Sequence, residues 1–223
     1  MRLRFFFLLI GVWLGLSAWA QTAMPTMTYV DADGATQTET SFAGSAPFTP
    51  TFKANIEGAD GYTPRYEWQF YRNAETTPFL VRYDETTTYT FKESGSFSVK
   101  LLISFVQGNT TVEYEQDEVF TIAISESSLE FPNAFTPNGD GVNDVLQAKT
   151  GYKSITEFRA MVFSRSGKKI YEWTDPAQGW DGTSGGSPVP DGGYYLNVQA
   201  KGADGRVYDI KKVVSLLRKH YTQ

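Results

Sequence analysis

Apolar residues alternate with polar residues in short runs along most of this chain. Residues 66–70, 97–105 and 120–124 carry an apolar side chain at every second position, and so do residues 158–162 and 194–200. A period of two predicts strands with one buried and one exposed face. Clusters of Gly, Asn, Asp and Pro separate the runs, and no stretch shows the period of an amphipathic helix. The pattern predicts an all-β protein made of immunoglobulin-like β-sandwiches.

A polar stretch at residues 125–128 divides the chain into two halves. We therefore expect two sandwich domains, at residues 26–125 and 129–218. Residues 21–25 and the tail after Arg218 fall outside both, as chain ends often do.

The first 20 residues have the features of a secretory signal peptide. Arg2 and Arg4 precede an apolar run at residues 5–16, and an A-x-A site at residues 18–20 follows. This order predicts cleavage between Ala20 and Gln21. The alternative is an uncleaved membrane anchor, for which the run is short. No later segment is long and apolar enough to span a membrane as a helix.

The composition excludes most kinds of catalytic site. The chain has no cysteine, which excludes disulfides, thiolate metal sites, a cysteine nucleophile and a lipid-modified N-terminal cysteine. His220 is the single histidine and lies in the tail, so a Ser-His-Asp triad or a histidine zinc site has no basis. Adjacent carboxylates such as Asp84 and Glu85 point to opposite faces of a strand. We expect neither catalysis nor a cofactor.

The charge is acidic. The full chain carries 20 Lys and Arg against 25 Asp and Glu, and loss of Arg2 and Arg4 leaves a net charge near −7. This balance disfavours nucleic acid and anionic membrane surfaces as partners.

The most informative segment is residues 131–144, a short apolar strand that ends in dense turn chemistry. Two prolines fix φ, and Asn-Gly and Asp-Gly dipeptides follow them. The residues of the motif are Phe131, Pro132, Asn133, Phe135, Thr136, Pro137, Asn138, Gly139, Asp140, Gly141, Asn143 and Asp144.

This segment resembles the start of the type B C-terminal sorting domain of the type IX secretion system, also called the gliding motility-associated C-terminal domain. Trp180, Asp181 and Gly182 match a second segment of that family, residues 189–195 match a third, and Arg218 matches its closing basic residue. Ser166 stands where the family has a hairpin tryptophan, which is a departure from the family pattern.

The resemblance implies a protein of a Bacteroidota-type envelope that is exported through the type IX translocon. It also implies a partner barrel of the PorP/SprF type in the outer membrane. The protein would lie on the cell surface or the outer membrane, be secreted, or face the periplasm. Its function would be non-catalytic recognition, with signalling as one role.

A calcium loop is the alternative interpretation of Asn138, Asp140 and Asp144. Oxygen ligands at alternating positions beside glycine are typical of such loops. Val142 interrupts the alternation and no bidentate Glu follows, whereas Asn and Asp are also common turn residues.

The first half resembles the PKD family of immunoglobulin-like sandwiches. Residues 46–48, 66–70 and 89–101 carry the resemblance, with Trp68 expected between two sheets. The family's Gly-Asp-Gly turn is absent, and Tyr71 begins a different segment in its place. Tyr71, Phe79 and Tyr83 could instead form a glycan platform, which would make the chain a small adhesin.

Overall fold

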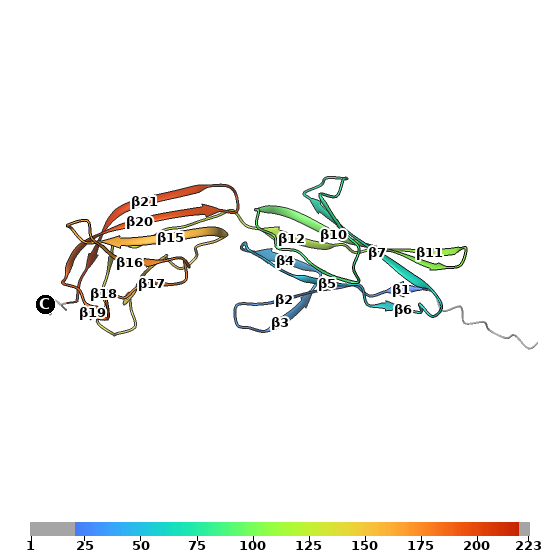
Figure 1. The fold of residues 1–223 in the computed structure, drawn as a ribbon, viewed down its shortest axis with the longest axis horizontal. Coiled ribbons are helices and arrows are strands. Elements are labelled where there is room, and N and C mark those ends of the chain that lie inside the picture. Colours follow the sequence, from blue (N-terminus) through green and yellow to red (C-terminus); the bar gives the residue numbers. More distant parts are fainter. Residues whose placement is uncertain (1–20, 219–223) are drawn as a thin grey trace, which may run out of the picture.

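The computed structural model describes residues 21–218. The predicted signal peptide and its cleavage bond after Ala20 therefore lie outside the described residues. The described chain is all β, with 21 strands and no helix among its elements, which confirms the predicted fold class. No described helix could cross a membrane. Figure 1 shows an elongated molecule in which two groups of strands lie end to end.

The first sandwich packs a large sheet against a smaller one. The large sheet has the order β4-β12-β10-β7-β8, with β11 also paired to β10, and the smaller sheet has the order β3-β2-β5-β9. A short ladder joins β1 (Thr22–Ala23) to β6 (Ile56–Glu57). The strands of the large sheet are β4 (Ser41–Gly44), β7 (Thr63–Arg72), β8 (Leu80–Arg82), β10 (Gly95–Gln107), β11 (Thr110–Glu115) and β12 (Phe120–Ile124). Those of the smaller sheet are β2 (Thr26–Val30), β3 (Thr36–Glu39), β5 (Thr51–Lys53) and β9 (Thr86–Thr88).

Alternation in the central strands creates the core of this sandwich. Every second residue of β10 from Phe97 to Phe105 is buried, as the sequence pattern predicted. Trp68 on β7 is fully buried, lies 5.8 Å from Phe52 on the facing sheet, and donates its indole N–H to the Asp84 carbonyl (3.0 Å). A large aromatic side chain thus fills the space between the two sheets.

The second sandwich has one five-stranded sheet with the order β13-β21-β20-β15-β16. Small ladders that join β14 to β17 and β18 to β19 lie outside that sheet. Its strands are β13 (Ala134–Phe135), β14 (Leu146–Gln147), β15 (Ile155–Phe163), β16 (Lys169–Trp173), β17 (Gly179–Trp180), β18 (Thr183–Ser184), β19 (Ser187–Pro188), β20 (Gly192–Gly202) and β21 (Val207–Leu216).

Hydrogen bonds connect the two sandwiches. Ser154, with φ of 48°, accepts a bond from the backbone N–H of Ala46 (3.1 Å) and lies 3.0 Å from the hydroxyl of Ser125. The backbone N–H of Ser94 donates to the Ala203 carbonyl (3.1 Å). Ala203 packs with the core of the first sandwich, so the β20–β21 turn touches both halves.

Candidate functional site

Arg218, just beyond β21, binds two turns that are distant from it in sequence. Its guanidinium donates to the carbonyls of Gly182 (2.7 Å) and Val189, and lies 3.2 Å from a carboxylate oxygen of Asp191. Its backbone N–H donates to the other oxygen of Asp191 (2.9 Å). Charge-assisted bonds of this kind are stronger than neutral ones. They hold the end of β21 against both turns.

Gly182 lies at the centre of this arrangement. Its φ is +82°, and a Cβ there would lie 2.7 Å from the guanidinium of Arg218, 3.0 Å from Leu216 and 3.1 Å from Pro137. A side chain would meet both a strained backbone and a filled space. Pro137, Gly182 and Arg218 come from three separate sequence segments, and the structure brings them together.

Trp180 supports this cluster from the core. It is fully buried, its ring lies 5.3 Å from Phe135 and 5.0 Å from Tyr194, and its indole N–H donates to the Thr183 carbonyl (2.7 Å). Asp181 accepts bonds from the backbone N–H (2.9 Å) and hydroxyl (2.7 Å) of Thr183. The predicted residues at 180–182 therefore shape one turn.

The first residues of the motif, at 131–133, lead into β13. Phe131 is buried 6.3 Å from the rings of Phe158 and Trp173, in the same hydrophobic core as Trp180. Pro132 is half-buried beside it. The Asn133 carbonyl accepts a bond from the N–H of Ser215 (2.9 Å), which leads the chain into β13. These residues fix the entry strand.

The carboxylate of Asp144 organises the loop between β13 and β14. It accepts bonds from the backbone N–H groups of Asn138 (2.9 Å), Gly139 (2.8 Å) and Gly141 (2.8 Å). The donors at Gly139 and Gly141, followed by the one at Asn138, hold the pKa of Asp144 below its ordinary value. Backbone N–H groups that surround an anion form an anion-binding arrangement, whereas a cation site would need oxygen atoms that point toward the ion.

The other polar residues of the loop also bond within it. Asp140 accepts from the side-chain amide of Asn138 (2.9 Å) and the backbone N–H of Val142 (2.8 Å). Asn143 has φ of 55°, and its carbonyl accepts from the N–H of Thr136 (2.8 Å). The residues of the possible calcium loop thus fold back on their own backbone, as turn residues do.

Replacement of Asp144 by Asn should lower the melting temperature at neutral pH, because an amide cannot accept all three N–H donors. Because folding lowers the pKa of Asp144, the ionised carboxylate stabilises the fold at pH values above its pKa in the unfolded chain, near 3.8. This stabilisation is lost as the pH falls through the lower pKa of the folded protein. Thermal melts at several pH values should show the difference between parent and variant narrowing in acid. A pH-independent difference would contradict this assignment.

Sequence reasoning missed the partners of Arg218. Asp191, Val189, Leu216 and Tyr194 complete the cluster, and the hydroxyl of Tyr194 donates to the Pro190 carbonyl (2.7 Å). The turn chemistry at residues 189–195 was visible in the sequence. Nothing in the local sequence indicated that Arg218 would bind this turn.

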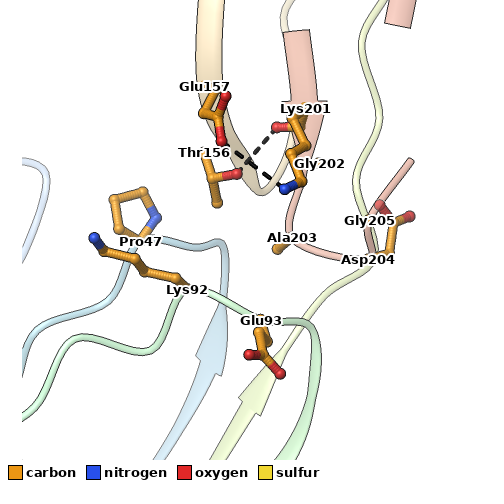
Figure 2. Close-up of a pocket in the computed structure, with 10 residues that line it drawn as sticks. All are labelled: Pro47, Lys92, Glu93, Thr156, Glu157, Lys201, Gly202, Ala203, Asp204 and Gly205. Atoms are coloured by element: carbon orange, nitrogen blue, oxygen red, sulfur yellow. Dashed lines mark hydrogen bonds and ion pairs between the residues drawn. The ribbon is translucent and has the colours of Figure 1, made fainter. Parts of the chain in front are cut away.

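A cavity of about 730 Å³ lies between the sandwiches (Figure 2). Pro47, Lys92 and Glu93 line it from the first sandwich, and residues 156–157 and 201–205 line it from the second. Figure 2 shows the Glu93 carboxylate turned away from Thr156 and Lys201. Glu93 binds Arg72 (2.6 Å), so it is engaged outside the cavity. The lining does not converge on a reacting centre.

The three aromatic residues of the possible glycan platform differ in exposure. Phe79 packs with the core, 5.7 Å from Tyr89 and 6.4 Å from Phe70. Tyr71 is half-buried on β7, with its hydroxyl bonded to Gln69. Tyr83 alone is widely exposed, at 69%. The packing of Phe79 against the core argues against a glycan platform formed by these three residues.

Comparison with known proteins gives one strong result. Residues 129–212 match the family model of the CHU_C type IX secretion signal domain. No curated protein matches the chain. Two solved structures are similar over 89% of the chain: dimeric latent PorU from Porphyromonas gingivalis (13% identity, TM-score 0.28) and a marsupial T cell receptor (8% identity, TM-score 0.26). The alignment covers 20% of the PorU chain and 73% of the receptor chain.

The second sandwich is therefore a β-strand export domain, with its family motifs held together by Arg218 and Trp180. It is a type IX secretion signal domain of the CHU_C family. The protein is exported by the type IX route, as the resemblance implied.

Proposed function

We propose that this chain is a non-catalytic envelope protein that acts by recognising an outer-membrane barrel of the PorP/SprF type. The cluster around Arg218 is the observation that carries the proposal. It ties the two turns that contain Gly182, Val189 and Asp191 to the end of the sheet. Loops held by a rigid scaffold are suited to protein recognition.

The layout supports a role beside the secretion system. In the described residues a small sandwich precedes the export domain, which resembles the arrangement in PorA, a small type B protein that partners a PorP-like barrel in envelope signalling. The two sandwiches differ in charge. Residues 21–125 carry six Lys and Arg against 14 Asp and Glu, whereas residues 126–218 carry 11 of each. The first sandwich would present an acidic surface to a second envelope component.

The proposal includes no cofactor. Both carboxylate oxygens of Asp144 already accept N–H donors, and no group of three or more His, Asp or Glu side chains in the described part of the chain could hold a metal ion. A calcium titration followed by thermal melting should leave the midpoint unchanged. A rise at millimolar calcium would contradict this part of the proposal.

Crosslinking in intact cells tests the partner. Outer membranes crosslinked and purified through this protein should yield a PorP/SprF-type barrel. Arg218→Ala should reduce the yield, because it releases both turns from β21. Lys169→Ala is a matched control: this exposed cation lies at the start of β16 and binds Glu172 (2.6 Å). Equal yields from both variants, or no barrel from the parent protein, would exclude the proposed surface.

A small adhesin or glycan-binding module is the second candidate, supported by the exposed ring of Tyr83. A glycan array with the whole protein and with Tyr83→Ala distinguishes it. Binding that depends on Tyr83 would favour the adhesin.

A further inference from the structure

One edge of the export-domain sheet is open over most of its length. β20 pairs with β21 along one side, whereas β13 covers the other side only at Ser215 and Leu216. The N–H groups of Ser215 and Leu217 bond toward β13, and the register with β20 is regular from residue 207 to 216. Alternate residues of a strand direct their backbone groups to the same side. The N–H and C=O groups of Val207, Asp209, Lys211 and Val213 therefore face the open edge.

No backbone group in the part of the chain that the structure describes pairs with this edge. Proteins usually protect such edges by short strands, bulges, proline or charged side chains, and of these β21 has only the charged residues Asp209, Lys211 and Lys212. β16, at the opposite edge, has five residues and a register shift beside Phe163. β21 has ten residues, no proline and no irregularity. Its side chains Val207 and Val213 are 75% and 54% exposed.

We propose that β21 of a second copy pairs antiparallel with this edge, about a twofold axis at Ile210. The sequence of the strand is self-complementary about that point. Val207 of one copy faces Val213 of the other, and Asp209 faces Lys211. The backbone groups of all four residues point to the open edge. The two copies of β21 can therefore form regular antiparallel hydrogen bonds.

The charges favour a second copy over an unrelated strand. Asp209 and Lys211 already bind each other within one chain (2.7 Å). In the dimer, Asp209 of each copy would lie opposite Lys211 of the other copy. Cross-strand pairs of opposite charge stabilise sheets. Any other register of the same two strands would bring like charges together or leave the valines without an apolar partner.

The inner side of the edge has room for the incoming strand. A hollow of about 350 Å³ lies there, lined by Leu129, Phe131, Ile210 and Lys212 among others. The Lys212 ammonium donates to the Phe131 carbonyl (2.9 Å) at its wall. Ile210 of the second copy would enter this hollow and face Ile210 of the first.

The outer face extends the apolar contact. Phe163, Tyr195 and Val213 are register partners across β15, β20 and β21 and form one row. Tyr195 is half exposed, and the row ends at the open edge. Val207 of the second copy would continue it, which would cover the two most exposed aliphatic side chains of β21.

Sedimentation of the purified protein from about 1 µM to 1 mM, the range of weak interfaces, tests the proposal. The parent protein should form dimers at the upper end. Asp209→Lys and Lys211→Asp should each weaken association about tenfold or more, because each places like charges across the axis. An equimolar mixture of the two variants should dimerise again, since Lys and Asp then face each other.

Lys168→Asp is the matched control. It makes the same charge change as Lys211→Asp at an exposed site between β15 and β16, at the opposite edge of the sheet, and should leave the dimer intact. Unchanged melting temperatures would show that the variants fold. A parent protein that stays monomeric up to the highest concentration overturns the proposal. So does a dimer that survives both charge reversals, or a mixture of the two variants that stays monomeric.

Discussion

Replacement of Trp180 by alanine should lower the free energy of unfolding of the export domain by about 3–5 kcal/mol, the usual cost of removing a buried tryptophan. The side chain is fully buried between Phe135 and Tyr194, so the change leaves a cavity that three separate segments line. It also leaves the Thr183 carbonyl without its indole donor. Urea unfolding of parent and variant measures the loss.

The same variant should fail to be exported, because the turns that Arg218 binds rest on the Trp180 side chain. Tyr195→Ala is the control in the same region. Tyr195 lies beside Tyr194 on β20 but is half exposed, so its loss should cost less than about 1 kcal/mol. A Trp180→Ala protein as stable as the Tyr195→Ala protein would show that the cluster does not hold the domain together.

The strands of the central sheets could be predicted because their information is local. The alternation at residues 97–105 and 194–200 corresponds to the buried and exposed faces of β10 and β20. A strand with one face in a core repeats every two residues wherever it lies, so its pattern survives any arrangement of neighbours.

The site was only partly predictable because its contacts are long-range. Pro137, Gly182 and Arg218 stood out as family motif residues, but their meeting depends on how three turns pack. β13, β14 and β17 have two residues each and exist only through distant partners, such as Leu146 opposite Trp180. A two-residue strand has no period to detect.

The loop at residues 136–144 shows a different limit. Its composition fits both a cation site and a self-bonded turn, since carboxylate and amide oxygens serve either purpose. The distinguishing fact is the direction of the N–H groups of Gly139 and Gly141, which depends on their positive φ. Glycine permits that conformation without requiring it.

Replacement of Trp68 by alanine should destabilise the first sandwich by about 3–5 kcal/mol and leave the export domain folded. Trp68 is fully buried against Phe52, and its indole N–H binds the Asp84 carbonyl. The core of the export domain contains no residue of the first sandwich, and few hydrogen bonds cross between the two. Limited proteolysis should therefore degrade residues 21–125 first and leave a fragment that spans the export domain.

The Trp68→Ala and Trp180→Ala proteins should differ in export. If residues 129–218 suffice for recognition by the secretion system, the Trp68→Ala protein should still leave the cell while the Trp180→Ala protein should not. Tyr71→Phe, on the outward side of the same strand, controls for surface change on β7. Degradation of both halves at the same rate in the Trp68→Ala protein would mean that the bonds of Ser154 and Ala203 couple the sandwiches into one unit. Export would then depend on the fold of the whole chain rather than of its second half.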